Sequence, residues 1–340
     1  RKGAYRGVHY SKKPFYVIDT AFYLKPITNS FDERWAFYQL LNFDINNIDS
    51  GSAIPSTSRE AFYQIPVGLP PLPTQRKIAA ILFVYDDLTE NNLRRIKILE
   101  EMAQNFYSEW FVKFRFPGHE KVKMVDSPIG MIPEGWKVAG IFQVPFFDFV
   151  QANIRPYEGR KTYYATADVN GIEVTGNGIE YTYASKPSRA QKQPTLNSVW
   201  CARMQSTYKV LFFTDANKDF ADNSMISSGF LGFKSHDKVT FPFLLLTIDS
   251  IDFHTLKDKY CTGATQRSLT NEGLGHVDVV IPPLNLVLDF GHVIGSSIDE
   301  ILILQQKNRI LRAARNLLLP RLISGELDVS GLDIKTGDDE

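Results

Sequence analysis

The chain has 340 residues, enough for two or more domains of ordinary size. Lys and Arg together number 38, as do Asp and Glu, so the net charge is zero; this excludes a uniformly basic protein but not a local basic patch. Two cysteines exclude a disulfide-rich scaffold, and every apolar run is shorter than the roughly 20 residues of a membrane-spanning helix. We therefore expect a cytoplasmic protein that does not contact a membrane.

Two segments of the chain resemble each other at a constant separation of 212 residues. The matching landmarks are Gly51 and Gly263, Pro70-Pro71-Leu72 and Pro282-Pro283-Leu284, and Ile98-Leu99 and Ile310-Leu311. Three landmarks at one separation indicate an internal duplication. The second copy has more chain before its Pro-Pro-Leu than the first, so the repeat predicts that part of the first domain is absent. Residues 1–74 are then the C-terminal part of domain 1.

A long helix is predicted after each Pro-Pro-Leu. Between Thr74 and Val112 the chain has no Pro or Gly, and apolar residues recur every three or four positions, which predicts a helix over 75–116 with Thr74 as its N-cap. The second copy predicts a helix over 286–324, which Gly291 and Gly295 weaken and Pro320 bends or ends.

The partner of each long helix is open at this stage. Each helix either packs on its own domain or the two pack on each other as an antiparallel coiled coil. Asn92 aligns with Leu304 of the second copy, and Asn308 aligns with Ile96 of the first. Polar residues offset in this way favour mutual packing, because a buried polar residue fixes the register of a coiled coil.

The stretch 117–285 holds a turn-rich linker and a second domain. Short β-type runs alternate there with Gly, Asn, Asp, Ser and Pro, which predicts a β-rich mixed domain. The predicted strands are Thr162–Ala165, Ser198–Arg203, Lys209–Phe213 and Phe241–Ile248. The acidic tail, 325–340, is expected to be disordered. The predicted class is α+β, with two β-rich mixed domains, the first partial, separated by two long helices.

The sequence has no motif for catalysis. It lacks the glycine-rich loops that bind phosphates or dinucleotides, paired His or Cys residues at metal-ligand spacing, and the Gly-x-Ser-x-Gly turn of serine hydrolases. These absences predict a chain that is not an enzyme and that holds no metal or cofactor of its own.

Basic residues are concentrated in two parts of the sequence. From Ser185 to Lys209 there are five basic residues and no acidic one, and five more lie between Arg1 and Lys13. Such runs are usually solvated loops, but basic side chains also neutralise phosphates, while Arg, Gln and Ser read base edges. Ser56–Arg59 and Gln266–Ser268 occupy matching places in the two copies, which favours DNA binding. The predicted DNA contacts are Arg6, Lys12, Lys13, Arg59, Arg160, Lys161, Lys186, Ser188, Arg189, Lys192, Gln266 and Arg267.

Taken together, these segments resemble one known family, the specificity subunits of type I restriction–modification systems. The resemblance extends over nearly the whole chain. The segments that carry it are Ile65–Ile78, Gly130–Lys137, Tyr164–Val169, Lys186–Ala190 and Leu319–Leu327. The resemblance implies target recognition domains that each read one half of a split site on double-stranded DNA. The incomplete first domain is a departure from that arrangement.

The resemblance also implies partners. The two long helices would bind two methyltransferase subunits, and restriction subunits would complete the complex; S-adenosylmethionine, ATP and Mg would belong to these partners. The outward side chains Asn92, Arg95, Gln306 and Arg309 are the predicted contacts. The alternative from a different class is a non-catalytic adaptor whose domains bind protein and whose coiled coil spaces them.

Overall fold

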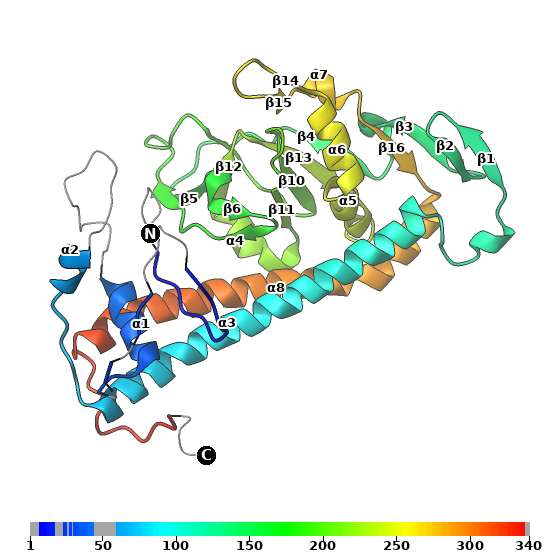
Figure 1. Ribbon diagram of the computed structural model, residues 1–340. Helices are drawn as coiled ribbons and strands as arrows, with labels where there is room; N and C mark the ends of the chain where they lie inside the picture. Colours follow the sequence, from blue (N-terminus) through cyan, green and yellow to red (C-terminus); the bar gives the residue numbers. More distant parts are fainter. Residues whose placement is uncertain (1–6, 18–22, 26, 29, 44–58, 337–340) are drawn as a thin grey trace. The chain divides into compact units, whose positions relative to one another are not determined.

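The computed structural model describes residues 7–17, 23–25, 27–28, 30–43 and 59–336. The chain forms two compact units: unit 1 is residues 1–92 with 307–340, and unit 2 is residues 93–306. Both long helices pass through both units (Figure 1). Among the described residues, no helix combines the length and apolarity needed to cross a membrane.

The two long helices begin at equivalent positions of the repeat. Helix α3 spans Leu72–Tyr107 and continues as a π-helical turn, Ser108–Val112, whereas α8 spans Leu284–Ile323. Thr74 therefore lies inside the first turn of α3 and is not its N-cap. Pro73 is tolerated beside it because first-turn N–H groups have no partner within a helix. Helix α8 runs through Pro320 and ends three residues later.

Within each unit, α3 and α8 pack against each other in antiparallel orientation. In unit 1, Arg315 forms an ion pair with Asp86 at 2.6 Å. In unit 2, the rings of Trp110 and Phe290 are 5.6 Å apart, and Arg95 pairs with Glu300 at 2.8 Å. In both units a higher residue number on α3 meets a lower one on α8. Mutual packing of the helices, rather than separate packing on two domains, is confirmed (Figure 1).

Asn92 and Asn308 meet in the interface between the helices. Both are buried, and Asn92 Nδ2 donates a hydrogen bond of 2.9 Å to Asn308 Oδ1. The equivalent residues of the repeat, Ile96 and Leu304, are both buried in the core of unit 2. The prediction that Asn92 faces outward toward a partner protein is therefore wrong, because its amide is used between the helices.

A double-mutant cycle on this pair tests its role. Asn308→Ile alone should lower the free energy of unfolding by about 1–3 kcal/mol, because the buried Asn92 amide loses its acceptor. Asn92→Leu combined with Asn308→Ile gives each position the residue of the other copy, Leu304 and Ile96, and should recover that loss or exceed it. Urea unfolding of the four proteins measures the coupling. A double variant no more stable than the single one would contradict this account.

Unit 1 is built around a small apolar core. Helix α1 spans Glu33–Asn42 and is capped by the Asp32 carboxylate, and α2 spans Arg59–Tyr63. Trp35 and Tyr38 of α1 pack there with buried residues of α3 and α8. Before α3, the described residues contain these two helices and no strand, so the β-rich character expected for domain 1 is seen only in unit 2.

The C-terminal segment is part of that core, so the prediction of a disordered tail is wrong for 325–336. Val329 is buried with Trp35, and the Lys77 ammonium donates to the Ser330 carbonyl oxygen at 2.7 Å. Leu327 packs on the same cluster. Acidic composition suggested disorder, but these two alternate apolar residues provide enough apolar contact to hold the segment.

Unit 2 contains two four-stranded sheets. The first has the order β11-β10-β13-β4 with antiparallel neighbours, and the second has the order β8-β5-β12-β9, in which β5 and β12 are parallel. Their strands are β4 (Phe147–Val150), β5 (Lys161–Tyr164), β8 (Ile179–Tyr181), β9 (Ala190–Lys192), β10 (Ser198–Ala202), β11 (Val210–Phe213), β12 (Ser224–Ser227) and β13 (Phe230–Ser235). Three of the four predicted strands correspond to β5, β10 and β11.

Unit 2 also contains four two-stranded ladders and four short α-helices, besides short 3-10 helices. The ladders pair β1 (Met124–Ser127) with β2 (Gly130–Pro133), β3 (Lys137–Gly140) with β16 (Asp278–Ile281), β6 (Val169–Asn170) with β7 (Glu173–Val174), and β14 (Cys261–Thr262) with β15 (Ser268–Leu269). The helices are α4 (Lys218–Asp222), α5 (Phe241–Ile248), α6 (Ile251–Lys259) and α7 (Asn271–Leu274). Helix α7 begins 212 residues after α2, as the duplication predicts.

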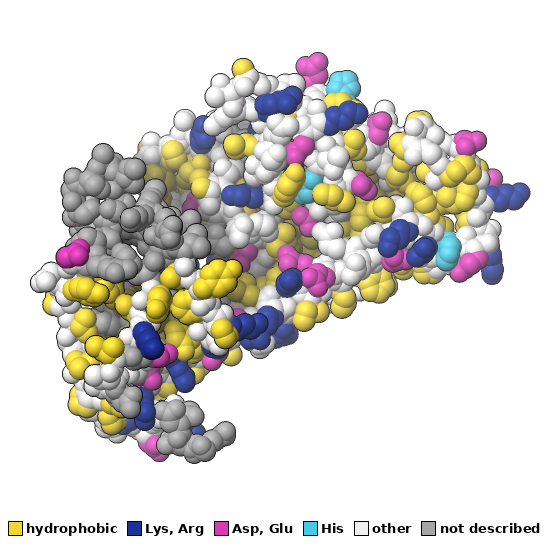
Figure 2. Space-filling model, in the orientation of Figure 1, with side chains coloured by type: hydrophobic (Ala, Val, Ile, Leu, Met, Phe, Trp, Pro, Cys, Tyr) yellow, Lys and Arg dark blue, Asp and Glu magenta, His cyan; other side chains and the backbone are white. Residues whose placement is uncertain are grey.

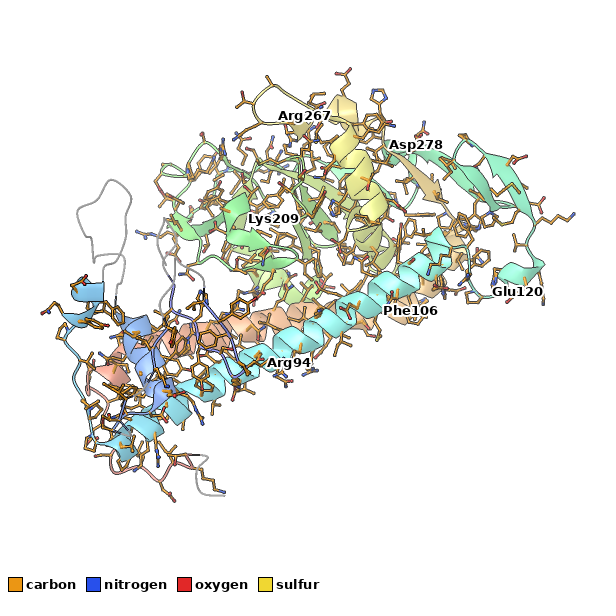
Figure 3. All side chains as sticks on the ribbon, viewed as in Figure 1. Arg94, Phe106, Glu120, Lys209, Arg267 and Asp278 are labelled. Carbon is orange, nitrogen blue, oxygen red and sulfur yellow. The ribbon has the colours of Figure 1, made fainter. Side chains whose placement is uncertain are left out.

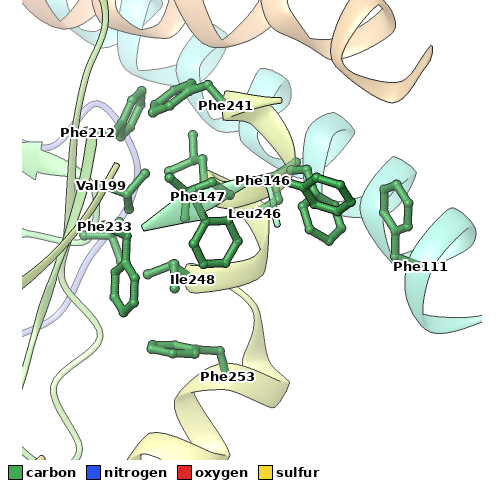
Figure 4. Close-up of a cluster of buried hydrophobic side chains, with 14 of the residues drawn as sticks. Phe111, Phe146, Phe147, Val199, Phe212, Phe233, Phe241, Leu246, Ile248 and Phe253 are labelled. Atoms are coloured by element: carbon green, nitrogen blue, oxygen red, sulfur yellow. The ribbon is translucent and has the colours of Figure 1, made fainter. Parts of the chain in front are cut away.

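The strand predicted over Phe241–Ile248 is wrong, because this segment forms α5. All eight residues are buried, so the run shows no periodicity from which a helix could be told from a strand. Pro242 sits in the first turn, where its fixed φ suits a helix. Figure 4 shows α5 side chains such as Phe241 and Leu246 among the aromatic residues of the core.

Gly291 permits close packing of α8 within unit 2. A Cβ atom at this position would lie 1.8 Å from the carbonyl oxygen of Val239, in the turn before α5. Only glycine allows the backbone to approach so closely. Gly291 has a low helix propensity, but it allows α8 to pack closely against the turn that precedes α5.

Candidate nucleic-acid interface

Four backbone hydrogen bonds join loops that are far apart in the sequence. Arg203 N donates to Gly229 O at 2.9 Å, and Ser228 N donates to Arg189 O at 2.8 Å. Gln205 N donates to Arg267 O at 3.0 Å, and Leu269 N donates to Arg203 O at 2.8 Å. The loops after β10, before β9 and between β14 and β15 are thereby fixed along one edge of unit 2.

This edge carries a cluster of basic residues, which we call the basic rim: Arg189, Lys192, Arg203 and Arg267. Arg189 and Arg267 are exposed. Figure 3 places Arg267 on the β14–β15 loop, on the opposite side of unit 2 from Phe106 of α3, and Figure 2 shows dark-blue side chains at that edge. In the described part of the chain, no carboxylate forms an ion pair with any rim residue.

Two of the rim cations, Arg203 and Lys192, are half-buried. Arg203 follows β10 and Lys192 ends β9, and Lys192 Nζ donates to Asn153 Oδ1 at 2.9 Å. Burial lowers the pKa of Lys192, and the nearby Arg203 charge lowers it further. Burial also lowers the pKa of Arg203, whose Nε atom is buried without a hydrogen-bond partner.

The β10–β11 loop, Arg203–Lys209, is held from beneath by a buried lysine of α6. Lys257 is fully buried, and its ammonium donates to Met204 O at 2.8 Å and to Thr207 O at 3.1 Å. The third contact is an ion pair with Asp258 Oδ1 at 2.9 Å. Because a buried charge is costly unless it is satisfied, these contacts strongly favour one conformation of the loop.

Asp258 fixes the tip of the same loop. Its Oδ1 accepts from Ser206 N and its Oδ2 accepts from Tyr208 OH, both at 3.0 Å. Burial raises the pKa of Asp258, but hydrogen bonds from Lys257, Ser206 N and Tyr208 OH outweigh this effect and lower it. Ser206 is held at φ 53°, and Tyr208 remains half-exposed. The tip is thus preorganised while its side chains reach solvent.

Several predicted DNA contacts lie in this region. Ser188, Arg189, Gln266 and Arg267 are exposed at or beside the rim. Lys186 is half-buried, and its ammonium donates to Ala190 O at 3.0 Å. Two stretches of sequence that were predicted separately therefore lie on one surface.

Other predicted DNA contacts bind residues of this chain or lie outside the residues that the structure describes. Lys12 pairs with Asp87 at 2.6 Å, Arg160 lies 4.0 Å from Glu180, and Lys161 donates to Gln193 Oε1 and to the Asp222 carbonyl. Lys13 is exposed. Arg6 lies outside the described residues; Arg59 begins α2, and its side chain is not described. Sequence reasoning missed Arg203, Lys257 and Asp258 as members of the site, although Arg203 lies within the acid-free run.

The long helices leave apolar residues in solvent. On α3 in unit 2, Ile98, Met102 and Phe106 are 60%, 42% and 38% exposed at four-residue spacing. On α8 in unit 1, Ile310 is 62% exposed, and it is the repeat equivalent of Ile98. We call these the helix stripes.

The polar side chains predicted to meet partners behave differently from one another. Arg95 forms an ion pair with Glu300, Gln306 is exposed, and Arg309 is half-buried. The repeated exposed isoleucines are therefore the clearer signal of a docking surface on these helices. They were visible in the sequence as one of the three landmarks of the duplication.

Comparison with known proteins shows what the chain is similar to. The profile of the "Type I restriction modification DNA specificity domain" matches residues 7–101. The MjaIX specificity subunit of a type I restriction enzyme of Methanocaldococcus jannaschii is 23% identical over 308 residues, which cover 85% of this chain. The MjaVIII specificity subunit of the same organism is 31% identical over 115 residues, or 33% of this chain and 26% of that protein. The chain is thus similar to specificity subunits of type I restriction enzymes.

The chain spans 66% of the length of the MjaIX subunit. Among solved structures, a type I restriction–modification S subunit from M. genitalium has a TM-score of 0.47 and 14% identity, covering 86% of this chain and 72% of that one. The HsdS subunit from Thermoanaerobacter tengcongensis has a TM-score of 0.35 and 15% identity, covering 86% and 70%.

Proposed function

We propose that this chain is the non-catalytic, DNA-reading subunit of a type I restriction–modification complex. In this proposal unit 2 binds one half of a split target on double-stranded DNA, and partner subunits methylate adenine or restrict the DNA. The basic rim carries the proposal, because three arginines and a lysine without acidic partners suit a phosphate backbone. The similarity to type I restriction specificity subunits supports the same function.

The partners would supply the chemistry. Methyltransferase subunits would bind S-adenosylmethionine, and restriction subunits would bind ATP and Mg, in the prokaryotic cytoplasm. This chain's own residues would position those subunits on a chosen site. The competing role, a protein-binding adaptor, would use the rim for acidic proteins instead of DNA.

Salt-dependent DNA binding separates the two roles. The chain in complex with its methyltransferase subunits should bind duplex DNA with an affinity that falls steeply as salt rises, by about 0.9 in log–log slope for each phosphate contact. Fluorescence anisotropy over a series of salt concentrations measures this slope. Failure to bind any duplex, including genomic fragments that carry the host's methylated sites, would favour the adaptor.

We further propose that the helix stripes dock two methyltransferase subunits, one at Ile98 and one at Ile310. Ile98→Glu or Ile310→Glu should each weaken one docking event by about 10- to 100-fold, because loss of a central apolar anchor costs about 1–3 kcal/mol. Stability should change by less than about 0.5 kcal/mol, since both side chains are exposed.

Native mass spectrometry checks the stoichiometry. Wild type should hold two methyltransferase copies, each single variant one, and the double variant none. Leu332→Glu is the matched control, because Leu332 is 51% exposed and lies in the C-terminal segment. Two copies retained by the double variant would contradict docking at the stripes.

A further inference from the structure

The hydroxyl group of Tyr208 uses its only hydrogen within the protein. It donates to Asp258 Oδ2 at 3.0 Å, while Asp258 Oδ1 accepts from Lys257 Nζ at 2.9 Å and from Ser206 N at 3.0 Å. The ion pair with a buried ammonium keeps Asp258 ionised, and an ionised carboxylate only accepts hydrogen bonds. Because a phenol has one hydrogen, the Tyr208 hydroxyl oxygen can form a further hydrogen bond only as an acceptor.

This oxygen is held in place and reaches solvent. The centre of the Tyr208 ring lies 4.9 Å from that of the His254 ring and 5.4 Å from the Lys257 ammonium. The side chain is nevertheless 52% exposed, and within the described residues its hydroxyl oxygen accepts no hydrogen bond. Donation to Asp258 also raises the pKa of Tyr208, so the hydroxyl stays protonated at neutral pH. Tyr208 therefore presents a fixed, acceptor-only group.

The loop that carries Tyr208 is joined to the exposed β14–β15 loop. Gln205 N donates to Arg267 O at 3.0 Å, and Met204 forms an isolated β-bridge with Ser268. Tyr208 follows Gln205 by three residues, so their Cα atoms are at most about 11 Å apart, less than the roughly 12 Å width of a DNA major groove. A duplex held at the basic rim through Arg267 would therefore bring base edges to Tyr208.

We propose that Tyr208 is a specificity-determining residue whose hydroxyl oxygen accepts a hydrogen bond from the exocyclic amino group of one target base. The inference rests on the proposed DNA-binding function and adds a base contact to it. In the major groove, adenine N6 and cytosine N4 are donors, whereas thymine O4 and guanine O6 are acceptors; in the minor groove only guanine N2 is a donor. An acceptor-only hydroxyl therefore favours adenine or cytosine from the major groove and guanine from the minor groove.

Base selection by the chain in complex with its methyltransferase subunits tests this role. Tyr208→Phe should lose about 3- to 10-fold of discrimination at one target position, because one hydrogen bond is lost, while the log–log salt slope stays unchanged. Tyr85→Phe removes the same group from α3 in unit 1 and should leave every position unchanged. Selection from a randomised pool measures the base preferences, and anisotropy titrations measure the slope.

Modified bases test the contact on the wild-type protein as well. Purine in place of adenine, or 2-pyrimidinone in place of cytosine, removes a major-groove amino group, and hypoxanthine in place of guanine removes the minor-groove one. One of these replacements, at the position that Tyr208→Phe relaxes, should weaken wild-type binding by the same factor and leave Tyr208→Phe unaffected. Which replacement acts also identifies the groove.

The outcomes separate this inference from the function on which it rests. A wild type that selects a target, with a Tyr208→Phe variant that keeps the same preference at every position, would overturn this inference alone. A wild type that binds no duplex would overturn the proposed function as well. An equal loss of affinity for specific and random duplexes in Tyr208→Phe, with a lower melting temperature, would show that the hydroxyl only braces the loop.

Discussion

Lys257→Met is expected to lower the free energy of unfolding by about 3–5 kcal/mol, the usual consequence of removing one partner of a buried ion pair. Lys257 is fully buried, so the variant leaves Asp258 without its cation and the carbonyls of Met204 and Thr207 without their donor. The loop beside Arg203 should then lose its fixed shape. Urea unfolding measures the free energy of unfolding. The affinity of the methyltransferase complex for duplex DNA reports whether the loop keeps its conformation.

The effect should depend on pH with a definite sign. Asp258 has a lowered pKa in wild type, so its contribution to stability is present above about pH 4, the ordinary value for an aspartate, and is lost as pH falls through the folded pKa. Without Lys257 the carboxylate should titrate at higher pH, and protonation relieves the unpaired charge. The stability difference between variant and wild type should therefore shrink below about pH 5.

Two controls isolate the ion pair from simple truncation. Lys257→Met with Asp258→Asn removes both charges and should recover part of the loss. Lys259→Met replaces an exposed lysine at the C-terminal end of α6 and should leave the free energy of unfolding nearly unchanged. A Lys257→Met protein as stable as wild type at pH 7 would show that the lysine does not brace the loop.

Replacing Arg189, Arg203 and Arg267 together by Gln should reduce DNA affinity by roughly 10²-fold near physiological salt, since each lost phosphate contact costs about fivefold. The salt slope should fall by nearly three units if each arginine makes one contact. Anisotropy titrations with specific and random duplexes give both quantities. An arginine that instead reads a base should, when replaced alone, weaken specific binding by about 1–3 kcal/mol and relax one position of the target.

The matched control carries the same charge change away from the rim. Lys121, Lys123 and Lys218 are exposed, and their triple Gln variant should bind DNA nearly as wild type does. If both triple variants lose affinity equally, net charge rather than the rim determines binding. If neither does, unit 2 meets DNA through another surface.

The duplication was the part of the fold most readable from sequence. The 212-residue separation predicted a helix after each Pro-Pro-Leu, and α3 and α8 begin at the equivalent residues Leu72 and Leu284, three and two residues before the predicted starts at 75 and 286. The offset polar residues Asn92 and Asn308 indicated that the helices pack together. The repeat could not show that Asn92 bonds to Asn308, because the partner of a polar residue depends on the register between the helices. It also could not tell a buried helix from a strand at Phe241–Ile248, where every side chain is apolar or enclosed.

The site was only partly predictable for a similar reason. Arg189 and Arg267 were each identified from local composition, but they are 78 residues apart. Their loops are linked through backbone hydrogen bonds to Ser228 and to the β10–β11 loop. Local composition also could not reveal that Lys12 is paired with Asp87 on α3. In the sequence, Lys257 is one of several lysines on a helix. That its ammonium is buried beneath the β10–β11 loop depends on tertiary packing, which local sequence does not show.

Mapping methylated bases in host DNA tests the central claim most directly. Strains with the intact gene, with the gene deleted, and with the rim triple variant are compared by sequencing that detects modified bases. The account predicts a split motif, methylated on adenine in the intact strain, absent after deletion, and depleted by the rim variant, while Lys121, Lys123 and Lys218 replacements leave it in place. A methylome unchanged by deletion of the gene would contradict a role in choosing DNA targets.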